Sequence, residues 1–103
     1  MIRITAAAQS QLEDLEQHFT TRGRDLAVLR MVQAIDAATF RIEAQIGPFF
    51  PAPRPYPDLA DLGFRWLKEG RYWVAFVEVT DGFVVTGIFF ETANLPGRSE
   101  RPR

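Results

Sequence analysis

The chain has 103 residues, of which 47% are hydrophobic, and a net charge of −1 at pH 7. This length fits one domain with a hydrophobic core and leaves no room for a second. The near-neutral balance argues against binding of nucleic acid through a general basic excess, so any basic surface must come from local clustering. The sequence has no cysteine, which excludes disulfides, thiol catalysis and cysteine-based metal sites.

Location in the cell follows from what the sequence lacks. No apolar run approaches the roughly 20 residues that cross a bilayer. The first residues, MIRIT, lack the apolar stretch of a signal peptide. We therefore expect a cytoplasmic protein, without a membrane partner.

The first half of the chain predicts a strand and a helical hairpin. Ile2 and Ile4 alternate with polar residues, as in a short strand with one buried face. A helix should begin near Thr5 and end at Gly23, a candidate left-handed C-cap. Its apolar stripe has helical spacing and consists of Ala8, Leu12, Leu15 and Phe19.

A second helix is expected to begin at Asp25, as its N-cap, and to end at Gly47-Pro48. The few residues between the two helices predict an antiparallel hairpin. The predicted core stripe of the second helix consists of Leu26, Leu29, Val32, Ile35, Ala38, Ile42 and Ile46.

Residues 47–57 contain five of the seven prolines and predict an extended crossover from the helices to the sheet. We expect Phe49, Phe50 and Tyr56 to attach this crossover to the core.

The second half predicts a three-stranded meander. Residues 63–68 form one strand, and a turn at 68–71 uses Gly70. The nearly continuous apolar run 72–79 is typical of a central strand. Asp81-Gly82 is a strong hairpin signal, and 83–91 form the last strand.

These elements predict an α+β fold with the order β-α-α-β-β-β. The helical hairpin should pack on one face of an antiparallel sheet, with the first strand at an edge. The second face of such a sheet can stay open to a partner. Phe89 and Phe90 project to opposite faces, so we expect one of them to form an exposed apolar patch.

Several strings, in this order, resemble the ParE/RelE toxin superfamily from Thr5 to about Pro96. The strings are TAAA at 5–8 with LEDL at 12–15, AIDAA at 34–38, GFRWL at 63–67 with RYWVAF at 71–76, and VTGIFFE at 85–91. The resemblance implies one toxin domain over residues 1–96, followed by a flexible tail at 97–103.

The resemblance implies two activities on one fold. ParE-like members inhibit DNA gyrase by protein–protein contact, whereas RelE-like members are ribosome-dependent mRNA endonucleases. In both, a small antitoxin wraps the toxin. Members of the superfamily often carry a histidine and an arginine at the end of the last strand, where this chain has Phe90 and Thr92.

RNA cleavage needs a general base and cations that stabilise the developing charge. No candidate base lies near Arg65 or Arg71, and the only histidine, His18, is on the first helix. Within the resemblance, the sequence therefore favours the ParE-like activity. We expect no catalytic residue in this chain. The alternatives are a RelE-like endonuclease and an inactive homologue that only binds its antitoxin.

The resemblance also implies partners and contact residues. The expected partners are a ParD-like antitoxin in a hetero-oligomer and DNA gyrase, with DNA contacted only through the antitoxin. Residues expected to contact the target or the antitoxin are Arg65, Arg71, Tyr72, Phe90, Thr92, Asn94 and Arg98. Those expected to form the antitoxin groove are Leu12, Leu15, Phe19 and Leu29.

Each feature also has a purely structural interpretation. Arg65 can be a solvated residue or pair with Glu78, and Trp66 and Trp73 can be core residues rather than interface residues. A lone His18 has no companion ligands at metal spacing. The sequence also lacks a glycine-rich phosphate loop. No metal or cofactor is expected.

Overall fold

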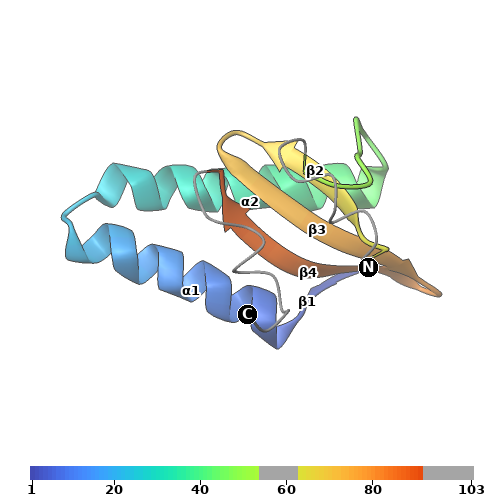
Figure 1. The fold of residues 1–103 in the computed structure, drawn as a ribbon, viewed down its shortest axis with the longest axis horizontal. Helices are drawn as coiled ribbons and strands as arrows, with labels where there is room; N and C mark the ends of the chain where they lie inside the picture. Colours follow the sequence, from blue (N-terminus) through green and yellow to red (C-terminus); the bar gives the residue numbers. More distant parts are fainter. Residues whose placement is uncertain (54–62, 92–103) are drawn as a thin grey trace.

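A computed structural model describes residues 1–53 and 63–91 and places two helices against one face of a four-stranded sheet (Figure 1). The elements are β1 (Ile2–Ile4), α1 (Ala6–Thr21), α2 (Asp25–Ala44), β2 (Arg65–Glu69), β3 (Tyr72–Val79) and β4 (Gly82–Phe90). The predicted α+β class and the β-α-α-β-β-β order are confirmed.

The sheet has the order β1-β4-β3-β2, so β1 lies at an edge as predicted. Strands β2, β3 and β4 are antiparallel neighbours, but β1 pairs with β4 in parallel. The sheet is therefore mixed rather than wholly antiparallel. The reason is the number of chain reversals. The helical hairpin, the return to β2 and the two strand hairpins reverse the chain four times, which leaves β4 running in the direction of β1.

The ends of α1 follow the sequence closely. The Thr5 hydroxyl accepts a hydrogen bond from the amide of Ala8 at 3.1 Å, which caps the first turn. At the other end Gly23 has φ +66°, and the amides of Gly23 and Arg24 bond back to the carbonyls of Thr20 and Phe19. This pair of bonds is a Schellman motif, which needs the left-handed residue that glycine supplies.

The ends of α2 differ from the prediction. Asp25 is the first helical residue rather than the cap, which is Arg24. The helix ends at Ala44, before Gly47-Pro48, because Gln45 adopts the left-handed conformation with φ 57°. The amides of Gln45 and Ile46 then bond to the carbonyls of Ile42 and Arg41 and close the helix there.

The predicted core stripe of α2 was only half correct. Ile35, Ala38 and Ile42 are buried, and Met31 joins them. Four other predicted members are large and exposed: Leu26, Leu29, Val32 and Ile46. Spacings of three alone drift around a helix with 3.6 residues per turn, so the first three of these four project away from the sheet.

Both faces of the sheet are covered. The helices pack on the face that carries Val74 and Phe76, while Trp66, Trp73 and Phe89 lie on the other face with Ala52. Phe89 and Phe90 do project to opposite faces, but Phe89 is only 4% exposed. The expected exposed aromatic patch is therefore wrong, because the crossover itself covers this face.

The crossover is attached by its phenylalanines, as predicted. Phe49 packs edge-on against Phe76, and Phe50 does the same with Trp73. The amide and carbonyl of Phe50 also bond to the backbone of Trp66. Tyr56, for which the same role was predicted, lies outside the described residues.

The β3–β4 hairpin is shifted by one residue from the prediction. Gly82 pairs with Val79 as the first residue of β4, so Thr80 and Asp81 form the loop. Gly82 also allows β1 to approach, since a Cβ at this position would lie 1.9 Å from the carbonyl oxygen of Met1.

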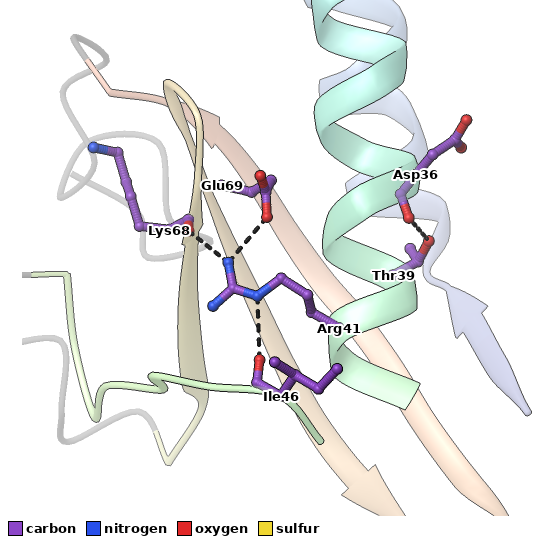
Figure 2. Close-up of polar contacts among 6 residues, drawn as sticks. All are labelled: Asp36, Thr39, Arg41, Ile46, Lys68 and Glu69. Carbon is purple, nitrogen blue, oxygen red and sulfur yellow. Dashed lines mark hydrogen bonds and ion pairs between the residues drawn. The ribbon is translucent and has the colours of Figure 1, made fainter. Parts of the chain in front are cut away.

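Arg41 joins the C-terminal end of α2 to β2 (Figure 2). Its Nε donates to the carbonyl of Ile46 at 3.1 Å, and one Nη donates to the carbonyl of Lys68 and the carboxylate of Glu69. The Arg41–Glu69 pair is mostly shielded, with 20% and 26% of the two side chains exposed. The two bonds to Lys68 and Glu69 hold the helix end against the edge strand β2.

We expect Arg41→Met to lower the free energy of unfolding by about 1–2 kcal/mol, because it leaves a shielded carboxylate without its charge-assisted partner. Urea unfolding measures the change. The control is Arg3→Met, which removes an exposed 4.0 Å ion pair with Asp81 and should cost less than about 0.5 kcal/mol. Equal losses in the two variants would contradict a structural role for the Arg41 bonds.

Candidate functional site

A pocket of about 500 Å³ lies between the turn of the helical hairpin and one end of the sheet. Its lining consists of Phe19, Gly23, Arg24, Asp25, Leu26, Ala27, Arg30, Gln33, Ala34, Gly70, Arg71, Tyr72 and Phe90. The β2–β3 turn and the end of β4 meet here, and the helices project past them (Figure 1). The pocket exists because the helical hairpin extends past this end of the sheet.

Three aromatic rings form the apolar side of the pocket. Phe19 and Tyr72 are buried, at 3% and 4% exposed, and Phe90 is half-buried between them. The Phe90 ring packs edge-on against both, with centroid distances of 5.8 Å to Phe19 and 5.3 Å to Tyr72. Since each ring is held by another, this side of the pocket is preorganised.

Three arginines give the pocket its charge. The Arg24 guanidinium lies 5.5 Å from the centroid of Phe19, and that of Arg71 lies 4.7 Å from the centroid of Phe90. Cations at these distances are attracted to ring faces. Arg30 is the third arginine, and among the described residues Asp25 is the one carboxylate in the lining. The lining therefore has a net positive charge in a protein whose total is −1.

Glu91 holds Arg71 in place at the end of β4. Its carboxylate accepts a hydrogen bond from Nε of Arg71 at 2.9 Å and pairs with Nζ of Lys68 at 3.4 Å. The bond from Arg71 lowers the pKa of Glu91 below its ordinary value; desolvation opposes the shift, and Lys68 adds to the lowering. The pair leaves the guanidinium stacked on Phe90.

The phenol of Tyr72 feels both the burial and the charge of the pocket. Burial raises its pKa above the ordinary 10.0, and the positive charges of Arg71 and Arg24 oppose that rise. Tyr72 is therefore neutral at physiological pH, where its hydroxyl can donate a hydrogen bond.

The structure brings together three of the predicted contact residues, Arg71, Tyr72 and Phe90, which all line the pocket. Phe19, predicted for the antitoxin groove, lines it with them. Arg65 lies near the other end of β2, where its side chain stacks over Phe76 and pairs with Glu78 at 3.6 Å. The pairing with Glu78 is the structural interpretation that the sequence left open. Arg65 is not part of the pocket.

The remaining predicted positions lie elsewhere. Leu12 and Leu15 of the predicted groove pack against the core, while Leu29 is 52% exposed on the outer side of α2. Of the four predicted groove residues, Phe19 alone lines the pocket formed by the described residues. Trp66 and Trp73 are core residues. Three predicted contact residues fall outside the described residues: Thr92, Asn94 and Arg98.

Sequence reasoning missed Arg24 and Arg30. One signal was present, because Ala27, Arg30 and Ala34 are spaced by three and four and therefore share a helix face. Two small residues beside an arginine leave room that larger side chains would fill. The missing information was the position of the β2–β3 turn opposite that face.

Other kinds of site find little support in the part of the chain that is described. Residues 1–53 and 63–91 hold no group of three or more His, Cys, Asp or Glu placed to bind a metal ion. His18 lies on α1, with its Nδ1 3.0 Å from a guanidinium nitrogen of Arg22. Within the same ranges, no helix is both long and apolar enough to cross a membrane.

Comparison with known proteins yields no family model that matches the chain and no significant match among curated proteins. The likeness to the ParE/RelE superfamily thus rests on the residue strings quoted above.

Acid titration should expose the role of Glu91. A lowered carboxyl pKa stabilises the fold above the ordinary value of 4.5 and stops doing so as the pH falls through the folded-state pKa. The stability difference between wild type and Glu91→Gln should therefore be present at pH 7 and shrink as the pH falls below 4.5, as measured by urea midpoints. Asp14→Asn, on the solvated face of α1, is the control. A constant difference across this range would contradict the pairing.

Alkaline titration should report the pocket's charge. Arg24→Gln removes a cation that favours the tyrosinate, so the pKa of Tyr72 should rise further. Ultraviolet difference absorbance follows the titration, and Tyr72→Phe separates this residue from Tyr56. Arg22→Gln removes a neighbouring charge that does not line the pocket and should shift the pKa less. Equal shifts in the two arginine variants would show that the pocket is not the source.

Proposed function

We propose that this protein is a ParE-like toxin of a type II toxin–antitoxin system. It acts in the cytoplasm by inhibiting DNA gyrase through protein–protein contact. A ParD-like antitoxin neutralises it in a hetero-oligomer, and contact with DNA is made by the antitoxin. The proposal rests on the residue strings that resemble the superfamily.

The observation that carries a binding function is the pocket at the end of the sheet. It gathers three of the residues expected to contact a partner, Arg71, Tyr72 and Phe90. Tyrosine and arginine are enriched among residues that dominate binding energy at protein interfaces. Here the phenol and the guanidinium are held by neighbouring groups before any partner arrives, which lowers the entropy lost on binding.

Features of the chain favour contact over catalysis. Cleavage of RNA needs a base near the cations that would hold the phosphate. The only histidine is on α1, where it bonds with Arg22. The carboxylate nearest to Arg71 is Glu91, whose lowered pKa makes it a weak base. The cation needed for phosphate is neutralised by the same pair.

A matched pair of variants tests the proposal. Arg71→Gln and Glu91→Gln both break the Arg71–Glu91 pair, but only the first removes the cation from the pocket. Expressed alone in bacteria, the wild-type chain should arrest growth and relax plasmid DNA. Arg71→Gln should weaken inhibition of purified gyrase at least about tenfold, since a charge-assisted bond contributes about 1.5–3 kcal/mol. Glu91→Gln should keep most of the inhibition.

The other outcomes separate the alternatives. Growth arrest with intact DNA topology and cleavage of ribosome-bound mRNA, abolished by Arg65→Ala, would overturn the gyrase proposal in favour of a RelE-like endonuclease. Normal growth, with gyrase unaffected in vitro, would leave an inactive homologue that only binds its antitoxin.

A further inference from the structure

The described cations on the sheet and its turns differ from those that line the pocket from the helical hairpin in whether a carboxylate lies nearby. On the sheet and its turns, each described cation lies within 4.0 Å of a carboxylate: Arg3, Arg65, Lys68 and Arg71. Arg24 and Arg30, which line the pocket from the helical hairpin, have no carboxylate that close among the described residues. Arg22 also lacks such a partner among the described residues, but it does not line the pocket. Arg24 and Arg30 therefore place unneutralised charge on one side of the cavity.

The N-terminal end of α2 strengthens the attraction of the pocket for an anion. The N-terminal turn of α2 opens into the pocket through Asp25, Leu26 and Ala27, and no side chain caps it. First-turn amides and the helix dipole favour a negative group there. They act together with two guanidinium groups, whose planar forks match carboxylate and phosphate geometry.

The rest of the lining selects between these two anions. Asp25 places a negative charge inside the pocket, which penalises a doubly charged phosphate more than a carboxylate. Leu26 is 57% exposed in the lining, beside Ala27 and the ring of Phe19. A ligand that combines one carboxylate with an apolar group would fit both the charged and the apolar parts of the lining. The net charge of −1 also gives the chain little general attraction for polyanions.

We infer that the pocket between the hairpin turn and the β2–β3 turn binds an acidic peptide segment of a protein partner. A glutamate or aspartate carboxylate enters between Arg24 and Arg30, and an adjoining hydrophobic side chain packs on Leu26 and Phe19. This assignment deepens the proposed function, on which it rests for the existence of a protein partner. It adds the chemistry of that partner.

The test uses the full chain and a defined probe. The probe is a fluorescein-labelled eight-residue peptide with two glutamates and two leucines, and the control peptide has glutamine in place of each glutamate. Fluorescence anisotropy measures the Kd. Amide shifts in ¹⁵N-labelled protein locate the bound peptide, which should perturb Gly23, Leu26 and Gly70. The glutamate peptide should bind at least about tenfold more tightly than the glutamine peptide.

Three variants resolve the contribution of the arginines. Arg24→Gln and Arg30→Gln should each weaken binding about tenfold. Arg22→Gln is the matched control, since Arg22 is adjacent in sequence but does not line the pocket, and it should leave the Kd within about twofold. Far-ultraviolet circular dichroism verifies that each variant is folded. If a variant does not fold, the comparison of the two peptides on the wild-type chain still tests the inference.

Three results would overturn the inference: equal affinity for the two peptides, equal effects of Arg22→Gln and Arg24→Gln, or shifts confined to another face. Displacement of the peptide by a 5′-phosphorylated octanucleotide at lower concentration than by unlabelled peptide would reassign the pocket to nucleic acid. A finding that the chain does not inhibit gyrase would leave the peptide Kd values and amide shifts unaffected, because peptide binding is measured directly. If the wild-type chain inhibits gyrase but does not bind the peptide, this inference is rejected and the proposed function stands.

Discussion

The structure depends on burying both faces of β3. Five consecutive residues of this strand, Tyr72 to Phe76, are at most 5% exposed, and β3 lies between β2 and β4 in the sheet. A strand without a polar face cannot border water on either side. The helical hairpin covers one face, and the crossover around Ala52 covers the other. The described residues of the crossover thus form a third layer on the sheet.

The position of the pocket follows from this packing. The β2–β3 turn, the end of β4 and the helical hairpin turn all occur at the same end of the molecule, where the helices continue beyond the sheet. Arg71 arises from the strand turn and Arg24 from the Schellman turn at Gly23. Glu91 then fixes Arg71 over Phe90. Two backbone turns and one ion pair thus place charge beside aromatic rings.

Overall composition gives no indication of this local charge. Balanced totals conceal a division in which sheet cations are paired with carboxylates, while the guanidinium groups of Arg24 and Arg30 have no such partner among the described residues. Recognition of a partner depends on that local surplus more than on net charge, since screening in physiological salt limits exposed charges to a range of about 8 Å.

Local sequence by itself determined the order of the elements, the central strand, the start of α1 near Thr5 and its termination before Gly23. Each of these depends on periodicity or on the backbone freedom of a nearby residue. Only the tertiary structure decided which side of α2 faces the sheet, because Leu29 and Ile35 are equally apolar and a helix can rotate about its axis. It also decided the parallel pairing of β1 and the joining of Arg30 with Tyr72 in one pocket. Those features depend on contacts between distant parts of the chain, which local patterns do not encode.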